Sequence, residues 1–457
     1  MIHPVVLVAM LIAIVLLLVL NRRWAIVPLL LIAIFTPFGQ QLYLAGMHFF
    51  VLRVVVIAGC LRLLIAKLTS REDLFAGGFT LFDGLFCSWA ICRAAAFMLL
   101  YHEVGAVLYQ IAFLVDALGG YFLLRYLIRD EADITRVAKL LAFIAVSMGF
   151  CTLIERFHNL NVFGYAGSFS VVPQFRDGQI RAQGAFGHPV LAGTFACTLV
   201  PMFFWLFRSG KARITALAGF LGATAMVLAA ASSTPVLAYI AGILGLCLWP
   251  IRNYMRVVRW GIVFTIAGLA MIMKAPIWFV IAHVDVVSAS SGWHRAELVN
   301  AFVNHFSSWW LLGSNNNQTW GYEMIDTSNQ YVGEGVSGGL VTLTFFIALI
   351  CQGFSRLGRT RKLMQERRDR AQEWFLWSLC AVLLAHVFAF WGTAYWDQTR
   401  FWWFTFLSVI PVATFAIQNA TEKVMIVEPS PSTTSVVSRR SVPVPSRSRI
   451  RDTKQTT

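Results

Sequence analysis

The sequence predicts an all-α fold, a polytopic transmembrane helix bundle of about 12–13 spans with a large, partly helical extracytoplasmic loop. Apolar residues of the set AVILMFWYC make up 58% of the 457 residues, against roughly 45–50% in soluble domains. Charged residues make up 13%, and the mean hydropathy is +0.68. Apolar runs recur along the chain, and the connections between them alternate in charge. One membrane bundle therefore explains the sequence more simply than several soluble domains.

A spanning helix needs about 20 mostly apolar residues, and fewer where Trp, Tyr or Arg flank it. The second predicted span is short and contains Pro28 and Pro37. The predicted spans are 4–20, 24–38, 49–67, 79–100, 106–128, 137–157, 189–207, 213–231, 234–250, 259–281, 335–354, 374–392 and 400–418.

The connections divide into a basic set and a neutral set, which alternate along the chain. Loops near 39–48, 101–105, 232–233 and 393–399 contain no Lys or Arg. By the positive-inside rule the basic set is cytoplasmic, so the N-terminus is outside and the C-terminus inside. The basic set comprises Arg22, Arg23, Lys67, Arg71, Arg129, Arg136, Arg208, Lys211, Arg213, Arg252, Arg256 and the dense run from Arg356 to Arg370.

Several classes of protein are disfavoured. The net charge of +15 comes from short basic clusters between apolar runs, so we expect no nucleic-acid partner. The eight cysteines lie in apolar segments without a CxxC spacing, which indicates neither a disulfide framework nor a zinc site. Met1–Leu20 has no basic region before its apolar stretch and no small-residue cleavage site, so we expect a retained first helix. We expect no metal and no cofactor.

We divide the chain into a membrane domain at 1–420 and a basic cytoplasmic tail at 421–457. The tail is rich in Ser, Thr, Pro and Arg, so it cannot bury a core and is expected to be disordered. Two outer loops are long, at about 158–189 and 282–334. Long loops beside a rigid scaffold often carry function. The second combines the polar run 313–318 with several aromatic residues, a composition that suits sugars.

Two outer arginines stand in distinctive contexts. Arg181 opens the segment Arg-Ala-Gln-Gly-Ala-Phe-Gly-His-Pro, just before a span, and Arg295 lies in Gly-Trp-His-Arg-Ala-Glu. A guanidinium group binds phosphate oxygens through a planar fork and stays charged where the dielectric constant is low. A pair of arginines at the outer rim is therefore suited to a lipid pyrophosphate, although arginines at such a rim also contact lipid headgroups without further function.

These segments resemble hallmarks of the O-antigen ligase and O-antigen polymerase superfamily. The segment R-x-x-G-x-x-G-H-P before a helix is one of them. Another is a large outer loop with an early arginine, which ends in an N-x-Y…G-x-x-G-G-L pattern at the start of the next helix. Here that pattern runs from Asn329 and Tyr331 to Leu340. The number of spans and the loop positions agree with the family over most of residues 1–420.

The resemblance implies metal-independent glycosyl transfer on the outer side of a bacterial inner membrane, in lipopolysaccharide or polysaccharide biosynthesis. The donor is a glycan on undecaprenyl pyrophosphate, and the acceptor is lipid A–core for a ligase or another glycan for a polymerase. Arg181 and Arg295 match the family's two pyrophosphate-binding arginines. The remaining residues that we expect at the substrates come from the same motifs: Gly184, His188, Ser328, Asn329, Tyr331 and Glu334.

One position departs from the family pattern. Ligases of this family usually carry histidine immediately before the asparagine that Asn329 matches, whereas this chain has Ser328. A serine hydroxyl is a poor base at neutral pH unless another base activates it. We therefore expect His294 or His305 to serve as the base, or the chain to be a polymerase-like or divergent member.

Two other functions compete with the one that this resemblance implies: solute transport, and glycosyl transfer by another class of polyprenyl-dependent enzyme. A transporter of a lipid-linked or polar solute would explain the charged residues within spans, because buried ionisable residues in membranes are usually functional. However, the sequence has neither paired broken helices nor two matching halves. Other polyprenyl-dependent glycosyltransferases commonly place carboxylates in the first outer loop, and 39–48 contains none. The charged residues in question are Arg53, Arg62, Asp83, Arg93, Asp116 and Glu155.

Overall fold

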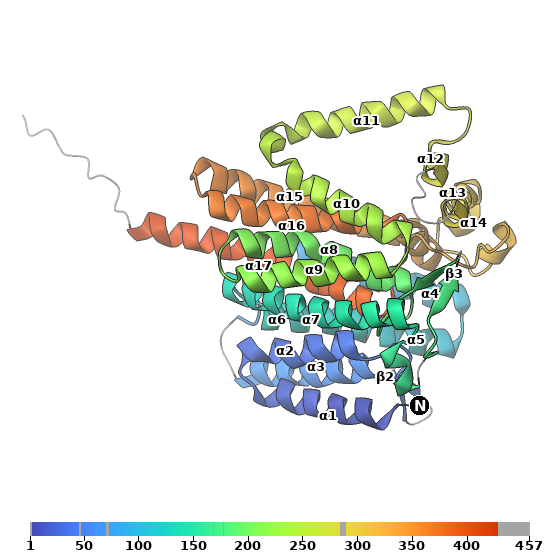
Figure 1. The fold of residues 1–457 in the computed structure, drawn as a ribbon. Helices are drawn as coiled ribbons and strands as arrows, with labels where there is room; N and C mark the ends of the chain where they lie inside the picture. The colour runs from blue at the N-terminus through green and yellow to red at the C-terminus, as the bar shows by residue number, and fades with distance from the viewer. Residues whose placement is uncertain are drawn as a thin grey trace, which may run out of the picture. The chain divides into compact units, whose positions relative to one another are not determined.

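The structure is a computed structural model, and it describes residues 2–44, 47–69, 73–167, 169–176, 178–283 and 289–427. It is mostly helical (78%), which confirms a helical bundle. The compact body extends to Gln418. Helices of the first half are α1 (Pro4–Val19), α2 (Arg22–Phe35), α3 (Val51–Thr69), α4 (Leu81–Tyr101), α5 (Val104–Leu114), the π-helical turn η1 (Val115–Gly119), α6 (Gly120–Leu127) and α7 (Glu131–His158) (Figure 1).

The second half continues the bundle and adds short helices between its spans. Its long helices are α8 (Pro189–Arg208), α9 (Arg213–Ala229), α10 (Ser233–Cys247), α11 (Met255–Ile272), α15 (Gln330–Glu366), α16 (Arg370–Phe390) and α17 (Asp397–Val427). The shorter ones are η2 (Val162–Ala166), η3 (Trp249–Tyr254), η4 (Ile277–Phe279), α12 (Val280–His283), α13 (Ala289–Asn304), α14 (Phe306–Trp309) and η5 (Asn317–Trp320).

Two small antiparallel hairpins complete the fold. Strands β1 (Gln41–Leu44) and β2 (Met47–Phe50) pair with Leu42 opposite Phe49, and β3 (Gln174–Arg176) and β4 (Gln179–Arg181) pair with Phe175 opposite Ile180. Neither hairpin was expected from the sequence. Both lie in predicted outer loops, where four-residue or three-residue strands leave too short a pattern to recognise.

Local chemistry explains several helix starts. Thr80 and Asp83 form a capping box at α4, in which the Thr80 hydroxyl accepts from the Asp83 N–H and the carboxylate accepts from the Thr80 N–H. At α8 the His188 ring accepts from the Val190 N–H at 3.2 Å, and Pro189 occupies the first helical position. These caps fix where the spans begin.

Each predicted span contains a helix, and several helices are long and apolar enough to cross a membrane. Among the described residues seven helices meet that criterion by length and composition, and α1, α9 and α10 are shorter apolar helices. The segment Trp249–Ile272 has no residue of its apolar window buried, and Figure 1 shows α11 apart from the rest of the bundle. Such exposed apolar surface suits contact with lipid tails.

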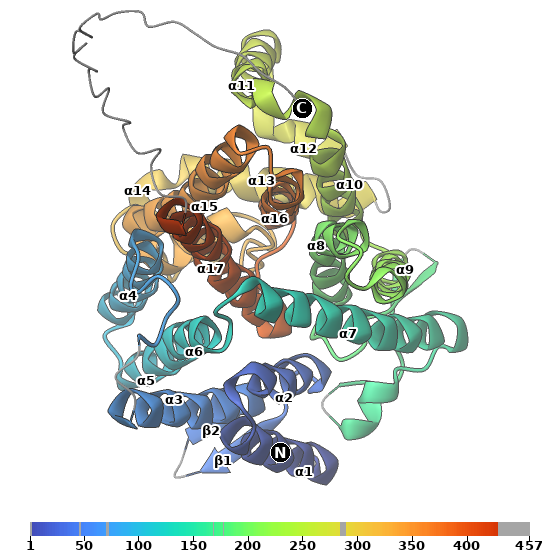
Figure 2. The ribbon, with the colours of Figure 1, turned by 90° about the vertical axis from the view of Figure 1, so that its left-hand side faces the viewer.

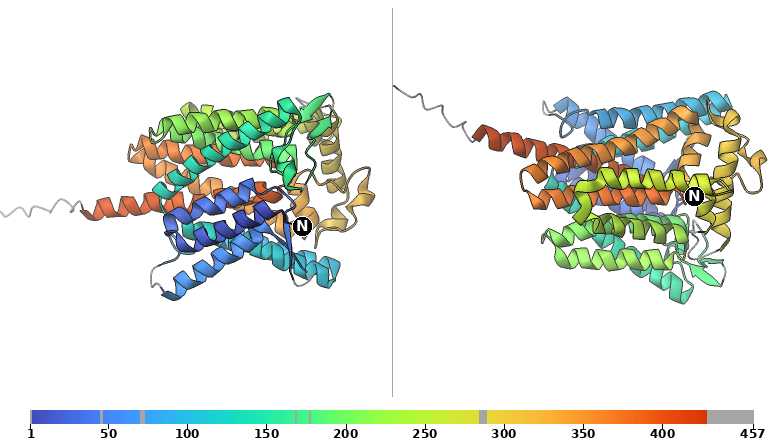
Figure 3. Two further views of the ribbon diagram at one scale, coloured as in Figure 1. Left: turned by 60° about the horizontal axis from the view of Figure 1, so that its bottom comes forward. Right: turned by 90° about the horizontal axis from the view of Figure 1, so that it is seen from above.

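The α17 helix forms the centre of the bundle. Its residues from Phe401 to Thr414 are buried, and Figure 2 shows it surrounded by α4, α6, α7, α8, α15 and α16. The polar segments gather at the two ends of the helices. The hairpin β3–β4 and the helices α12 to α14 lie at one end, and the connection between α15 and α16 lies at the other, in both views of Figure 3. We call the first of these the loop end.

Some predicted boundaries were wrong. The span predicted at 259–281 ends at Ile272, because Pro276 follows within one turn. The span predicted at 335–354 begins at Gln330 and continues to Glu366, so most of the basic run 356–370 is helix and not loop. Tyr331 and Glu334 consequently belong to α15 and not to the outer loop. At the C-terminus α17 reaches Val427, inside the predicted tail, and residues 428–457 lie outside the described residues.

Candidate functional site

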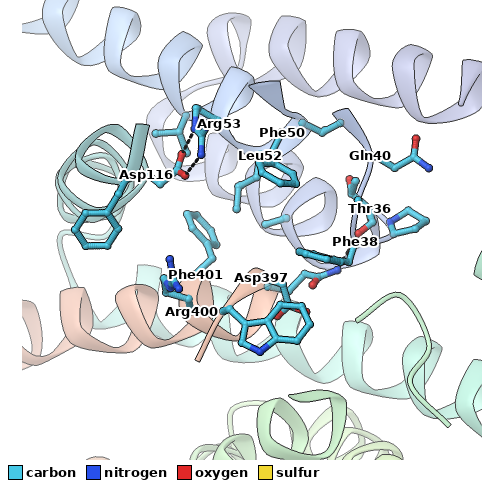
Figure 4. A pocket seen from close by; sticks show the side chains of 18 of the residues that line it. Thr36, Phe38, Gln40, Phe50, Leu52, Arg53, Asp116, Asp397, Arg400 and Phe401 are labelled. Atoms are coloured by element: carbon cyan, nitrogen blue, oxygen red, sulfur yellow. Dashed lines mark hydrogen bonds and ion pairs between the residues drawn. The ribbon is translucent and has the colours of Figure 1, made fainter. Parts of the chain in front are cut away.

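A pocket of about 300 Å³ opens where α2, the β1–β2 hairpin, α3, η1 and α17 meet (Figure 4). Most of its wall is apolar, and its polar groups come from the connection after α2 and from α3, α5, η1 and α17. Side chains of Phe113, Phe401 and Phe404 contribute aromatic surface. The polar and charged lining residues are Thr36, Gln40, Arg53, Tyr109, Asp116, Asp397, Gln398 and Arg400.

Arg53 and Asp116 form an ion pair at one side of this pocket. Nε of Arg53 donates to Oδ1 of Asp116 at 2.9 Å, and Nη2 donates to Oδ2 at 2.7 Å. Asp116 belongs to η1, the π-helical turn that interrupts the span 104–127. Single π turns inside α-helices are frequent at functional sites. This turn places a carboxylate in the pocket opposite α3.

Arg400 enters the pocket from α17, in a different environment from that of Arg53. Its Nε donates to the Tyr395 carbonyl oxygen at 3.0 Å. No carboxylate of the described residues lies within salt-bridge distance of it, although Glu334 and Asp116 are close enough to interact electrostatically. Arg93 also lies near and repels it. Two arginines and two aspartates therefore line the pocket, and of these Arg53 and Asp116 form a salt bridge whereas Arg400 and Asp397 do not.

Glu334, one of the residues predicted at the substrates, is fully buried beside this cluster. Its Oε2 accepts from the Trp89 indole at 2.9 Å, and its Oε1 accepts from Gln330 at 2.6 Å and lies 3.7 Å from Arg93. Gln330 in turn accepts from the Tyr395 N–H. The start of α15 is therefore tied to the connection between α16 and α17, which leads to Arg400.

The other motif residues at this start have structural contacts. Asn329 is fully buried, and its side-chain oxygen accepts from the backbone N–H groups of Tyr331 and Val332, so it caps α15. The Tyr331 hydroxyl donates to the Val387 carbonyl oxygen at 3.3 Å. Ser328 is half-buried immediately before the cap. The N-x-Y pattern thus explains where the helix begins.

The segment from Arg181 to Pro189 reaches the same pocket at its far end. Gly187 packs against Trp396 and Phe38, and its N–H donates to Oδ2 of Asp397 at 2.8 Å. Gly184 has a φ of +60°, its N–H donates to the buried Glu155 carboxylate at 2.8 Å, and its carbonyl accepts from Asn161. A glycine here fits because an L side chain rarely adopts this conformation.

Arg181 and His188 stand at the two ends of that segment. Arg181 is the last residue of β4 and is 7% exposed. His188 caps α8, outside the predicted span, and burial lowers its pKa to about 4, with smaller contributions from Arg181 and Arg176. The ring is therefore neutral at physiological pH. Arg181 does not line the pocket of Figure 4.

The residues predicted on the second outer loop lie on or beside α13. Arg295 is 8% exposed, and His294 is half-buried. His305 follows the helix, its Nδ1 lies 2.9 Å from the Ala301 carbonyl oxygen, and its ring stacks on Trp320. None of the three lines the pocket. The structure thus bonds Gly187 to the lining residue Asp397 and connects Gln330 through Tyr395 to Arg400. It places Arg295, His294 and His305 elsewhere at the loop end.

Charged residues within the spans are mostly engaged in ion pairs or hydrogen bonds. Asp83 pairs with Arg125 at 3.0 Å, Arg62 donates to the carbonyl oxygens that end α1, and Glu155 holds the Gly184 loop. Arg53 and Asp116 both pair and line the pocket. These contacts give most of the charges within the spans a structural role.

Two functional candidates, Asp397 and Arg400, were not among the residues predicted from the sequence. Arg400 begins the predicted span 400–418, and Asp397 lies in the predicted loop 393–399, which contains no Lys or Arg. One signal was available: an arginine at the outer end of a span opposes the charge asymmetry of the other connections. No protein-family model matches this sequence, and no curated protein matches it.

Proposed function

We propose that this protein transfers a glycan from undecaprenyl pyrophosphate to an acceptor sugar hydroxyl on the outer side of a bacterial inner membrane. The product is ligated O-antigen or an extended polysaccharide. The observation that carries the proposal is Arg400, an arginine without a salt bridge to the described residues, in a mostly apolar pocket. Both family-like segments hydrogen-bond to residues at its edge, Gly187 to Asp397 and Gln330 to Tyr395.

The pocket suits an amphiphile that has an anionic group. Its aromatic and aliphatic wall offers contact to an isoprenoid chain, and Arg400 offers a charge-assisted partner to a phosphate oxygen. Arg53 offers a second guanidinium group once its pairing with Asp116 is relaxed. A neutral sugar alone would leave Arg400 without a partner at salt-bridge distance in surroundings of low dielectric constant, whereas a phosphate group would supply one.

Arg181 and Arg295 do not line the pocket, and the family resemblance is what assigns pyrophosphate binding to them. They are thus proposed to contact other oxygens of the donor pyrophosphate than Arg400 does. Stabilising the negative charge that develops on the leaving pyrophosphate speeds glycosyl transfer, because that charge is largest in the transition state. Arg181 leads directly into the segment whose Gly187 contacts the pocket. We propose that Arg181 and Arg295 bind the pyrophosphate of the same lipid-linked donor molecule.

Deletion of the gene, followed by gel electrophoresis of surface polysaccharide, tests the function. Loss of polymer attached to lipid A–core indicates a ligase, and a single-unit band indicates a polymerase. The deletion strain is then complemented with wild type or with Arg400→Ala, with equal membrane insertion checked by immunoblot. An unchanged gel in the deletion strain contradicts the proposal.

A further inference from the structure

We propose that Asp397 is the catalytic base, which accepts the proton of the acceptor hydroxyl as that hydroxyl attacks the donor sugar. This inference rests on the function proposed above. It replaces the histidines as the source of base catalysis, and it assigns a role to a carboxylate outside the family-like segments.

The geometry places the Asp397 carboxylate at the pocket and holds it there. Oδ2 accepts from the Gly187 N–H at 2.8 Å, and Oδ1 accepts from the Thr399 N–H at 3.1 Å. Asp397 has a φ of +53°, a region that few non-glycine residues adopt and that recurs at functional sites. Each carboxylate oxygen has a further lone pair, so the group can still accept a proton from a ligand.

The neighbours of Asp397 supply what the reaction requires. Figure 4 shows Asp397 and Arg400 on the α17 side of the pocket, with Arg53 and Asp116 facing them from α3 and η1. An anionic leaving group on Arg400 would thus lie in the same pocket as the carboxylate. By contrast, neither His294 nor His305 lines this pocket.

The proposed step balances as a single displacement. The acceptor oxygen forms a bond to the anomeric carbon while its proton moves to a carboxylate oxygen of Asp397. The bond from the anomeric carbon to the pyrophosphate oxygen breaks, and its electron pair leaves with the pyrophosphate. Asp397 then releases the proton to water, so no oxidant, reductant or metal is required.

The protonation behaviour of Asp397 agrees with this role. Asp397 precedes the predicted span 400–418, and burial raises the pKa of its carboxyl to about 7. The N–H groups of Gly187 and Thr399, and the charge of Arg400, act in the opposite direction. Among the described residues, the other titratable or charged groups of the pocket are Arg53, Tyr109 and Asp116, and His188 lies beside Gly187. A base is most effective when its pKa lies near the working pH.

The test uses the full-length protein in lipid nanodiscs, with lipid-linked glycan and acceptor extracted from the deletion strain. We expect Asp397→Asn and Asp397→Ser to lower kcat by about 10²–10⁴-fold with KM little changed, because both keep a capping oxygen and lose the base. Asp397→Glu should recover part of kcat. The wild-type rate should fall as the pH drops through about 7, and the Asn variant should lose that dependence.

A matched control is Asp369→Asn, since Asp369 caps α16 at the opposite end by accepting from the Gln372 N–H at 3.0 Å. It should retain wild-type kcat. A wild-type kcat in folded Asp397→Asn or Asp397→Ser overturns the inference. The inference also fails if kcat falls in Asp397→Asn and Asp397→Ser but is not recovered in Asp397→Glu, and the pH dependence of the Asn variant stays that of wild type. Asp397 would then serve only to cap the backbone N–H groups. If wild type itself transfers no glycan, the proposed function fails instead.

Discussion

Arginines at the loop end differ in what surrounds their guanidinium groups. Arg53 has a bidentate carboxylate partner, and Arg93 lies 3.7 Å from Glu334. The Arg156 guanidinium donates to the Ile180 carbonyl oxygen and to Gln179, so it fixes the β3–β4 hairpin to α7. Arg400 faces an apolar pocket without such a carboxylate among the described residues. These differences separate arginines that hold the fold from one that is available to a ligand.

Arg181→Ala and Arg295→Ala are each expected to abolish polymer formation while the protein remains inserted. The lysine variants should rescue activity only in part, because lysine keeps the charge but loses the planar fork. Polymer per molecule of inserted protein is the measurement. Arg213→Ala, at an exposed site in a basic connection, is the control and should behave as wild type. Normal polymer from both alanine variants would rule out their pyrophosphate-binding role.

His188 predicts a pH dependence of stability. Its pKa is lowered to about 4 in the folded protein, whereas an exposed histidine titrates near 6.5. Between those values the unfolded chain binds more protons, so stability is full above about pH 6.5 and falls as the pH drops toward 4. We expect thermal melting in detergent to show a smaller acid-induced decrease in Tm for His188→Asn, which keeps the cap. Equal decreases would contradict this assignment.

Two elements depart from regular α-helix, one at the pocket and one within α15. The π turn η1 presents Asp116 to the pocket, and α15 bends at Gly339, which has a φ of +72° and a ψ of −173°. A Cβ at Gly339 would lie 2.7 Å from the carbonyl carbon of Leu311. The Leu340 N–H donates to the Trp310 carbonyl oxygen at 2.8 Å. The bend therefore docks the segment after α14 onto α15.

Gly339→Ala is expected to destabilise the protein by about 1–3 kcal/mol from backbone strain, with a further cost from the close approach to Leu311. The melting temperature of purified protein is the measurement. Gly358→Ala is the control on the same helix, because a Cβ there meets no described atom within 4 Å and alanine favours helix. A Gly339→Ala variant as stable as Gly358→Ala would show that the bend is not required.

At the scale of the whole molecule, the basic connections and the long polar loops lie at opposite ends of the helices (Figure 3). The Arg252 and Arg361 guanidinium groups both donate to Glu373 at 2.7 Å, which joins α16 to α15 and η3 at the basic end. The pocket lies toward the loop end. By the positive-inside rule, we therefore predict that the basic end is cytoplasmic and that the pocket lies toward the outer side.

Single-cysteine labelling checks this orientation. In a background with all eight cysteines replaced by alanine, Tyr322→Cys should react with an impermeant maleimide added outside intact cells, and Arg367→Cys should react only after the cells are opened. Both positions are exposed in the structure. Labelling of Arg367→Cys from outside would reverse the orientation and place the pocket on the cytoplasmic side.

The sequence by itself determined that the chain is a bundle of apolar helices and about where each one lies, because hydropathy is a local property of about 20 residues. The count of 12–13 spans stays a prediction, since seven helices among the described residues are long and apolar enough to cross a membrane. It also determined the charge asymmetry of the connections and the start of α8 at His188-Pro189. The predicted ends of two spans were wrong. The helix in 259–281 ends at Ile272, before Pro276. The helix in 335–354 continues to Glu366, because the basic residues after its apolar part still extend it.

Only the tertiary structure decided which polar groups meet. Gly187 and Asp397 are 210 residues apart in sequence, and Trp89 and Glu334 are 245 apart, yet each pair shares a hydrogen bond. No local pattern encodes such contacts, since they depend on how buried helices pack around α17. The pocket, its apolar wall and the environment of Arg400 result from that packing, and for this reason the motifs pointed to Arg181 and Arg295 but not to Asp397.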